Sequence, residues 1–282
     1  PSGCRHRSNS HGPDRHSRTL ILPTPLPTPL SPTEPELVRF AQTPSIVIAL
    51  DFDGTLAPLV DDPEDSRMLP EARSALEALT RLDGVSIALV SGRAIESLAR
   101  VASPLQEWFL VGSHGIEILS PGEVLHYETP WLVPQGLQRG FEGVVSQHPG
   151  TRLEVKPFGL ALHTRGVEPS RAREAEKEAA AVCDEWEGDL VIRSGHGILE
   201  CSVTEADKGE GLLALVERTG ASATLFAGDD LTDEDGFAVL GDWDISLRVG
   251  PGESRARFRI ADAAEMAQIL WRVFELRSAR SS

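Results

Sequence analysis

The sequence is poor in cysteine, tyrosine and methionine, and it has no long apolar run. Its 282 residues include three cysteines, one tyrosine and two methionines. Cys4, Cys183 and Cys201 lie far apart with no CxxC pair, so neither a zinc knuckle nor a disulfide framework is predicted. No apolar run approaches the roughly 20 residues that span a bilayer. Prolines break the early apolar pieces, so no secretory signal is predicted and we expect a cytoplasmic protein.

Positive charge is also scarce. The formal net charge is −16, and the first 45 residues hold five arginines against three acidic residues, so the remainder carries −18. An acidic body repels nucleic acids and anionic membranes over most of its surface. We therefore expect neither as a partner. The apolar content of 40% is sufficient for the core of one large domain or two modest ones.

Residues 1–42 have the composition of a disordered tail. Proline recurs every two to three residues in "LPTPLPTPLSPTEPE", which favours extended polyproline over helix or sheet. His6, His11 and His16 recur every five residues, a spacing compatible with a metal-binding tract. The polar, aperiodic surroundings favour a disordered basic tail instead.

After Pro44 the pattern alternates between buried strands and amphipathic helices. Strands are predicted at 45–50, 85–90, 107–112, 223–228 and 245–250, with helices at 70–82, 94–102, 207–218, 232–240 and 262–276. Short connections between such elements predict an α/β fold with a parallel sheet covered by helices.

The middle of the chain has a different pattern. Residues 152–156 and 159–165 form one predicted hairpin, residues 189–193 and 197–203 a second, and 168–187 a helix between them. This is typical of an antiparallel α+β insert. The predicted division is a tail at 1–42, a catalytic core at 43–118 and 204–282, and an inserted cap domain at 119–203.

Polar residues gather just beyond three of the predicted parallel strands, where open α/β sheets bind their ligands. The first strand end carries Asp51, Asp53, Gly54 and Thr55, the second Ser91, Gly92 and Arg93, and the third Asp229, Asp230 and Asp233. Carboxylates gathered in one cleft repel one another unless a cation lies between them. Hard oxygen ligands without cysteine suit Mg²⁺, which is the cofactor that we expect.

The first strand end has the residue types needed for phosphoryl chemistry. Asp51 can serve as metal ligand and nucleophile, and Gly54 permits a turn that directs Asp53 back toward the same cleft. Ser91 and Lys208 can hold the remaining phosphate oxygens. Each motif alone has a simpler explanation: an Asp-Gly turn, a helix start, acidic residues matching a helix dipole, or a solvated lysine. Their order, with three of the four directly beyond predicted strands, favours the functional interpretation.

"DFDGT", Ser91, Lys208 and "GDDLTD" resemble the four motifs of the haloacid dehalogenase (HAD) superfamily of phosphohydrolases, over residues 45–275. The resemblance implies a HAD-like Rossmannoid core with an inserted C2B-like cap. It implies that Asp51 forms an aspartyl-phosphate and that Asp53 is the general acid and base. The implied Mg²⁺ ligands are Asp51, the main-chain carbonyl of Asp53 and Asp229, with Asp230 or Asp233 holding waters. The implied phosphate-binding residues are Gly54, Thr55, Ser91, Gly92 and Lys208.

Five further segments, "VSGR", "GSHGIE", "LEVKPFGLALHTR", "LECSVTEADKG" and "GDDLTDEDGF", are similar to trehalose-6-phosphate phosphatases. The resemblance implies hydrolysis of trehalose 6-phosphate to trehalose and phosphate. The sugar-binding candidates that it implies are Arg93, His114, Glu154, Lys156, His163, Arg165 and Glu200. The chain departs from many relatives at Thr164, where they have tyrosine, and at Ser202-Val203, where they have Arg-Pro.

Alternatives remain for several residues and for the function. Glu154 and Lys156 can form an exposed ion pair, His163 can be structural, and Arg93 can support a loop. We place His126, His148 and His196 at the surface. The alternative functions are hydrolysis of another sugar phosphate (sucrose phosphate or a glycosyl-phosphoglycerate), phosphosugar mutase activity, or a non-catalytic regulatory domain that binds trehalose 6-phosphate. Losses among Asp51, Asp53, Lys208 and Asp229 are expected in such a silent domain, and all four are present. We expect a monomer that takes a small-molecule sugar phosphate, with a trehalose-6-phosphate synthase as a candidate partner.

Overall fold

The computed structural model describes residues 27–30, 35–124, 133–188, 190–195, 197–204 and 207–280. The larger of its two sheets has eight strands: β1 (Thr28–Pro29), β2 (Ile46–Leu50), β3 (Val85–Val90), β4 (Phe109–Gly112), β5 (Glu117–Leu119), β10 (Ala223–Gly228), β11 (Ile245–Val249) and β12 (Phe258–Ile260). Their order is β1-β12-β11-β10-β2-β3-β4-β5, and only the β4–β5 pair is antiparallel. The predicted α/β fold with a parallel sheet is confirmed.

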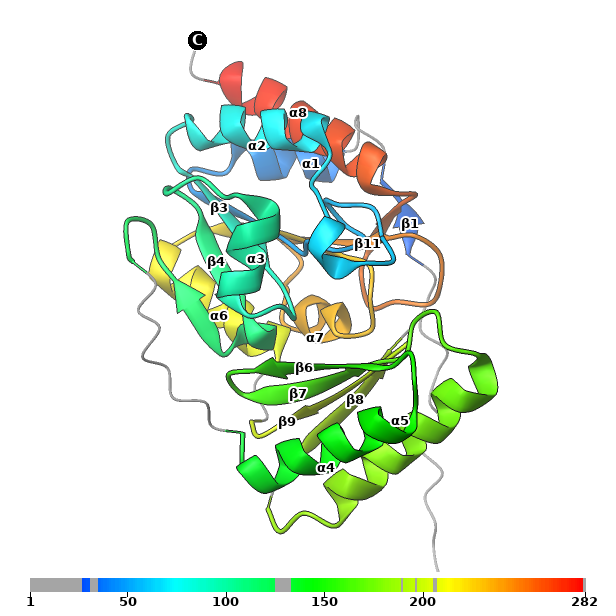
Figure 1. Ribbon diagram of the computed structural model, residues 1–282. Coiled ribbons are helices and arrows are strands. Elements are labelled where there is room, and N and C mark those ends of the chain that lie inside the picture. Colours follow the sequence, from blue (N-terminus) through cyan, green and yellow to red (C-terminus); the bar gives the residue numbers. More distant parts are fainter. Residues whose placement is uncertain are drawn as a thin grey trace, which may run out of the picture.

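Helices cover both faces of this sheet (Figure 1). One face packs against α1 (Pro35–Gln42), α2 (Pro70–Thr80), α3 (Ile95–Ala102) and α8 (Ala263–Ser278). The other packs against α6 (Lys208–Thr219) and α7 (Asp233–Ala238). Successive side chains of a strand point to opposite faces, so Ile46 and Ile48 enter the first core while Val47 and Ala49 enter the second. This double burial explains why the central strands are continuous apolar runs.

The second sheet is antiparallel and lies opposite the carboxyl ends of the central core strands (Figure 1). Its order is β6 (Arg152–Lys156), β7 (Gly159–His163), β9 (Ile198–Ser202) and β8 (Val191–Gly195). Helices α4 (Gln135–Gln147) and α5 (Pro169–Asp184) cover the face turned away from the core, and Leu137, Phe141, Leu160 and Leu162 pack in that layer. The other face is directed at the core, and side chains on it face the space between the two sheets.

The prediction of a disordered tail at 1–42 was wrong for the parts of this segment that the structure describes. Residues 28–29 pair with β12 at the sheet edge, and α1 buries Leu37, Phe40 and Ala41 in the core. The spacing of these three residues puts them on one helical face, a signal that the proline-rich sequence before them obscured. His6, His11, His16, His126 and His196 lie outside the described residues, as does Cys4.

Sequence reasoning also missed α4, β5 and β12. Strands β5 and β12 have only three residues each, and α4 contains several glycines, which weakens its helical pattern. Leu119, assigned to the insert, belongs to β5 of the core sheet. Two short 3₁₀ turns, η1 (Pro63–Asp65) and η2 (Ser113–Gly115), lie near the carboxyl edge of this sheet. Among the described helices, none has the length and apolar composition that a membrane span requires.

Candidate active site

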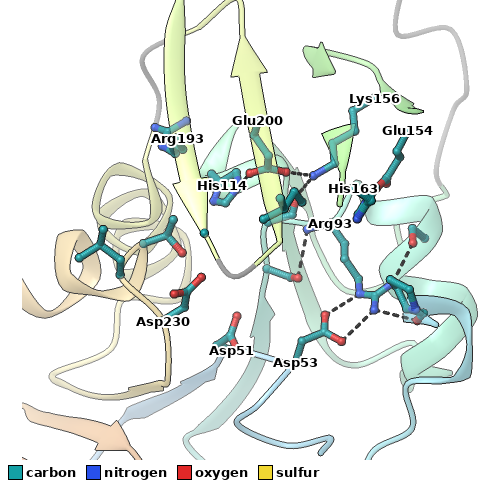
Figure 2. A pocket seen from close by; sticks show the side chains of 18 of the residues that line it. Asp51, Asp53, Arg93, His114, Glu154, Lys156, His163, Arg193, Glu200 and Asp230 are labelled. Atoms are coloured by element: carbon teal, nitrogen blue, oxygen red, sulfur yellow. Dashed lines mark hydrogen bonds and ion pairs between the residues drawn. The ribbon is translucent and has the colours of Figure 1, made fainter. Parts of the chain in front are cut away.

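A cleft of about 1650 Å³ lies between the carboxyl edge of the core sheet and the open face of the smaller sheet (Figure 2). Most of the predicted site residues line it, although they come from distant segments of the chain. They are Asp51, Asp53, Ser91, Gly92, Arg93, His114, Glu154, Lys156, His163, Arg165, Glu200, Lys208, Asp229 and Asp230. Gly54, Thr55 and Asp233 do not line the cleft, and Thr55 and Asp233 are fully buried.

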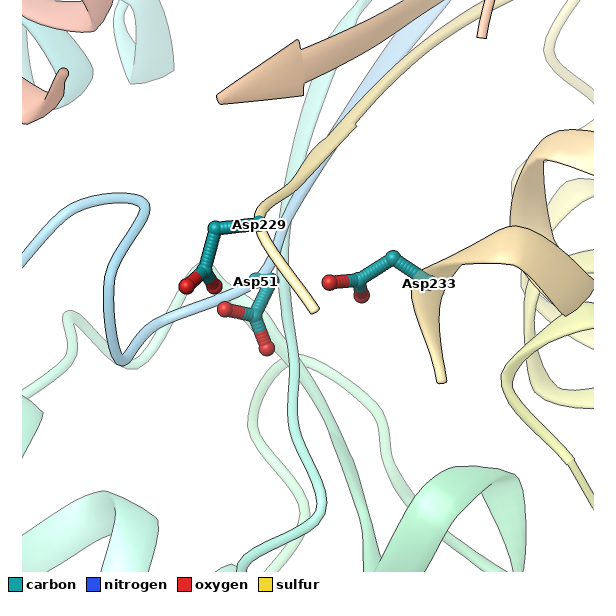
Figure 3. A group of neighbouring side chains, drawn as sticks. All are labelled: Asp51, Asp229 and Asp233. Atoms are coloured by element: carbon teal, nitrogen blue, oxygen red, sulfur yellow. The ribbon is translucent and has the colours of Figure 1, made fainter. Parts of the chain in front are cut away.

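Three carboxylates, two of which line the cleft, lie close together (Figure 3). Asp51 follows β2, Asp229 follows the neighbouring strand β10, and Asp233 begins α7. One oxygen from each lies within 4.8 Å of the others. Within the described ranges, the carboxylates of Asp53 and Asp230 do not belong to this group. Asp233 also accepts the backbone N–H of Asp230 at 2.9 Å, which fixes the loop between β10 and α7.

Lys208 is the cation that contacts this group. Its buried Nζ donates to Oδ1 of Asp51 and to Oδ1 of Asp233, both at 2.7 Å. Burial acts to lower the pKa of Lys208, but the two aspartates outweigh it and raise the pKa. For Asp51, burial raises the pKa and Asp233 and Asp229 add to the rise, outweighing Lys208. Burial, and then Asp233, raise the pKa of Asp229 to about 7.

The chemistry of this group fits a hard divalent cation. Three carboxylates facing one ammonium carry two excess negative charges when all are ionised. The raised pKa values of Asp51 and Asp229 show how poorly the protein alone accommodates that charge. Closely grouped carboxylate oxygens without nitrogen or sulfur donors are what Mg²⁺ binds. Asp51 and Asp229 could therefore hold such an ion at the surface of the cleft.

Gly54 allows the chain to turn directly beneath this group. Its φ is +85°, a conformation that residues with a side chain rarely adopt. A Cβ at this position would lie 2.1 Å from Oδ2 of Asp229. The turn and the close approach both require glycine, which explains why glycine follows Asp53 in the motif.

The Asp53 carboxylate is held by a two-pronged ion pair (Figure 2). Arg93 donates from Nε to Oδ2 at 2.6 Å and from Nη2 to Oδ1 at 2.8 Å, and Ser66 Oγ donates to Oδ1 at 2.7 Å. Arg93 also donates to the carbonyl oxygen of Pro63 at 2.8 Å. Burial acts to lower the pKa of Arg93, but its bond to Asp53 outweighs burial and raises it. These contacts favour the loop-supporting interpretation of Arg93, because it orients Asp53 and the turn η1.

Of the predicted phosphate-binding residues, Ser91, Gly92 and Lys208 line the cleft. Ser91 is buried, and its Oγ accepts the backbone N–H of Arg93 at 3.1 Å. Thr55 Oγ1 is buried without a hydrogen-bond partner in the described part of the chain. The carbonyl of Gly92 accepts a hydrogen bond from Lys156 Nζ at 3.2 Å, which brings the smaller sheet onto the core.

Charged side chains of the smaller sheet form ion pairs and hydrogen bonds, but Glu154 and Lys156 have different partners. Lys156 pairs with Glu200, and Glu154 bonds His163 with 2.7 Å between Oε2 and Nε2. The alternative of an exposed Glu154–Lys156 ion pair is therefore contradicted, since the Lys156 side chain is 14% exposed and pairs with Glu200. Burial acts to raise the pKa of Glu200, but Lys156 and His114 outweigh it and hold the pKa well below its ordinary value.

Other polar residues of the insert support its packing. Arg165 Nη1 donates to the carbonyl oxygen of Val60 in the core at 2.6 Å. Thr164 Oγ1 donates to Glu176 at 2.5 Å. The surface placement of His148 was wrong: it is buried, and its Nε2 lies 2.9 Å from Oε2 of Glu178. The hydrogen bond to an acidic residue on α5 satisfies this otherwise costly buried ring.

Sequence reasoning missed two residues that support the site. Arg248 lies at the carboxyl end of β11, lines the cleft and donates to the carbonyl oxygen of Asp230 at 3.0 Å. The strand-end rule that found Asp229 would have found Arg248 as well. Ser66, which bonds Asp53, lies in a loop between elements and gives no sequence signal.

The doubly wound core, the insert over its carboxyl edge and the acidic group beside Lys208 define a phosphohydrolase of the HAD type. A family model for trehalose-phosphatases matches residues 49–256. The chain belongs to the trehalose-phosphatase family, and it is an enzyme of that type, a phosphoric monoester hydrolase. The resemblance inferred from the motifs is therefore confirmed.

Individual relatives agree with this assignment. The chain is 30% identical over 272 residues to "Probable trehalose-phosphate phosphatase H" of Arabidopsis thaliana, covering 87% of this chain and 76% of that protein. The C-terminal domain of a Candida albicans trehalose-6-phosphate phosphatase superposes with a TM-score of 0.75 at 21% identity, covering 89% of this chain and 99% of that one. The C-terminal domain of the Candida albicans trehalose synthase regulatory protein superposes with a TM-score of 0.64 at 12% identity, covering 86% and 99%. These two structural likenesses concern the fold.

Proposed function

We propose that the chain hydrolyses trehalose 6-phosphate to trehalose and phosphate, using Mg²⁺ and a covalent phosphate ester of Asp51. The observation that carries the proposal is that Asp51, Asp229 and Lys208, which are grouped with the buried Asp233, line one cleft with the polar face of the smaller sheet. Membership of the trehalose-phosphatase family supports the reaction and the substrate.

The proposed reaction consists of two successive displacements at phosphorus, which use Asp51 and Asp53. A carboxylate oxygen of Asp51 attacks phosphorus while Asp53 protonates the departing sugar oxygen. Asp53 then removes a proton from water, the water attacks the aspartyl-phosphate, and phosphate leaves as Asp51 is regenerated. Arg93 and Ser66 now hold the Asp53 carboxylate, so it must exchange at least one of these bonds to reach the substrate.

Preorganised positive charge would stabilise the transferring phosphoryl group. Lys208 is fixed by two carboxylates, so little reorganisation is needed when phosphoryl oxygens approach. Mg²⁺, held by Asp51, Asp229 and the main-chain carbonyl of Asp53, would supply further neutralisation of these oxygens. The Ser91 hydroxyl, the Thr55 hydroxyl and the backbone at Gly54 and Gly92 complete the proposed phosphate site.

The sugar would lie against the open face of the smaller sheet. Glu154 and Lys156 on β6 and Glu200 on β9, on either side of β7, line the cleft together with the acidic group. A sugar bears many hydroxyl groups, and charged side chains that donate and accept hydrogen bonds recognise them well. A wrong sugar would leave these largely buried groups unpaired, which is the basis of selectivity.

A phosphate-release assay tests the proposal. With Mg²⁺, we expect turnover of trehalose 6-phosphate well above that of sucrose 6-phosphate, glucosyl-phosphoglycerate and glucose 6-phosphate, and near-complete loss in EDTA. Equal turnover of all four would contradict the proposed substrate. Conversion to an isomeric sugar phosphate without phosphate release would indicate a mutase.

The same assay separates catalysis from regulation. The regulatory alternative remains to be tested because the fold is shared with the C-terminal domain of a Candida albicans protein named as a trehalose synthase regulatory protein. The presence of Asp51, Asp53, Lys208 and Asp229 favours an active enzyme. Binding of trehalose 6-phosphate without turnover in Mg²⁺ would instead support the regulatory alternative. We further propose a monomer in the cytoplasm, where the free thiols of Cys183 and Cys201 would remain reduced.

A further inference from the structure

The loop that carries His114 has an unusual backbone. Ser113 and His114 are consecutive non-glycine residues with φ values of 48° and 55°. Such conformations persist where surrounding contacts impose them, and they cluster at functional sites. Here the backbone N–H of Ser113 donates to the carbonyl oxygen of Arg93 at 2.7 Å, and that of His114 to the carbonyl oxygen of Ser91 at 3.1 Å. The loop is thus fastened to the phosphate-binding segment that follows β3.

This backbone presses the His114 ring against Gly92. A Cβ at position 92 would lie 2.5 Å from Cε1 of the ring, so the contact requires glycine. The ring is therefore fixed on two sides, by its own backbone and by Gly92. Burial lowers the pKa of His114 and outweighs the opposing effect of Glu200, which favours the neutral ring.

His114 belongs to the core, but its hydrogen-bond partner belongs to the insert. Its Nε2 lies 2.9 Å from Oε2 of Glu200 on β9 (Figure 2). A neutral ring that bonds a carboxylate through Nε2 carries its proton on that nitrogen. The other nitrogen, Nδ1, is buried and has no hydrogen-bond partner within the described residues. The ring thus has one strong polar contact, and that contact crosses from one sheet to the other.

Glu200 is held on both oxygens. Lys156 bonds Oε1 and His114 bonds Oε2, while Lys156 also reaches the carbonyl of Gly92. Lys156 and Glu200 both lie on the smaller sheet, so their pairing does not depend on how that sheet is placed relative to the core. The bond from His114 exists only when that sheet lies against the core.

We propose that His114 is a positioning residue for substrate selection: it fixes the Glu200 carboxylate above Gly92 when the insert closes on the core, so that Glu200 reads the glucose unit that carries no phosphate. This rests on the proposed function, and it assigns His114 a role through Glu200 rather than a direct sugar contact. Selection of the sugar and closure over the phosphate site would then depend on the same hydrogen bond.

The chain contains a matched control pair. His148 and Glu178 make a bond of the same type and the same 2.9 Å length, but within the insert and away from the cleft. H148N removes that bond without touching the cleft. H114N removes the bond to Glu200 while keeping a residue type that tolerates a left-handed backbone. H114Q keeps an N–H donor near the position of Nε2.

The test compares trehalose 6-phosphate with p-nitrophenyl phosphate, which has no sugar, by their ratio of kcat/KM. We expect H114N to lower this ratio roughly 10- to 100-fold, as for loss of a hydrogen bond to a charged group. H114Q should recover most of the ratio, and H148N should leave it unchanged. In the double variant H114N/E200Q, the ratio should fall little further than in E200Q alone.

The outcomes separate this inference from the proposed function. A wild-type enzyme that shows no preference for trehalose 6-phosphate overturns both. A wild-type preference that survives in H114N, or additive losses in the double variant, overturns the role of His114 alone. Equal losses in H114N and H114Q would assign the effect to packing on Gly92 and would also overturn it. Should H114N not fold, H114G provides the same comparison, because glycine adopts this backbone without strain and removes the ring without adding a charge.

Discussion

At the scale of single residues, the charge balance around Asp51 decides how the site behaves. Asp51, Asp229 and Asp233 share Lys208, and burial strengthens every interaction among them. As the proposed nucleophile, Asp51 must be ionised to attack phosphorus, yet burial and its acidic neighbours oppose ionisation. A bound cation would resolve this conflict, and metal and proton would then compete for the same carboxylates.

This competition predicts a pH-dependent effect of Mg²⁺ on stability. The ordinary pKa of Asp229 is 3.8, and in the metal-free fold it is about 7. Between these values the folded chain keeps a proton that the unfolded chain has lost, so stability falls as pH rises. Mg²⁺ should therefore raise Tm more at pH 8 than at pH 5. Thermal melts in EDTA and in Mg²⁺ check this, and D229N should reduce the difference. Equal Mg²⁺ shifts at both pH values would contradict it.

Replacement of the nucleophile is the second prediction at this scale. D51N keeps the shape of the side chain but removes its charge, so phosphate release should fall by at least about 1,000-fold. The melting temperature should not fall, because the substitution relieves repulsion by Asp229 and Asp233. Phosphate release and circular dichroism measure the two effects. Substantial residual turnover in a folded D51N would remove Asp51 from its proposed role.

The types and positions of the site residues could be predicted from the sequence, but their hydrogen-bond and ion-pair partners could not. The strand-end rule located Asp51, Ser91 and Asp229, because the carboxyl ends of parallel strands meet at one edge. The i, i+2 spacing of Glu154 and Lys156 placed both on one face of a strand. It could not show that Lys156 bonds Glu200, since that pairing depends on how β6, β7 and β9 align in space.

At the scale of elements, α1 extends the core beyond the predicted catalytic region. The helix contributes Leu37 and Phe40 to the face of the sheet covered by α8. F40A should destabilise the fold by about 3–5 kcal/mol, since it deletes a fully buried ring. Q42A, at an exposed position of the same helix, is the control and should have little effect. Urea denaturation measures both, and equal values would show that α1 is not part of the cooperative core.

Long and strongly patterned elements were predictable, and short ones were not. β2, β3 and β10 are buried on both faces, so their sequences are unbroken apolar runs that stand out. β12 has three residues and is held in the sheet by its neighbours β11 and β1. A pattern of that length carries too little information to separate a strand from a loop.

At the scale of the whole molecule, the core and the insert meet through a few polar contacts above the cleft. One is the bond from Arg165 to the carbonyl oxygen of Val60, at the mouth of the cleft. Others join Lys156 to Gly92 and Glu200 to His114. Because few contacts hold the two parts together, single substitutions can shift the balance between closed and open arrangements.

Arg165 provides a test of this balance. R165A should lower kcat/KM roughly 2- to 10-fold, as expected for loss of one exposed hydrogen bond. The loss should appear with both trehalose 6-phosphate and p-nitrophenyl phosphate, because closure serves the phosphate site whatever the leaving group. R218A, on the far part of α6, is the control. A loss confined to trehalose 6-phosphate would instead indicate that Arg165 touches the sugar.

The strand order of the larger sheet has a consequence for the synthesis of this protein on the ribosome. Strand β10 lies beside β2 in the centre of the sheet, yet 178 positions separate Asp51 from Asp229 along the chain. A nascent polypeptide therefore exposes β2, β3 and β4 as an incomplete half-sheet until β10 has been synthesised. A product that stops at the end of β10 would carry Asp51 but lack Asp229 and Asp233, so it would lack the acidic group that we propose to bind the cation.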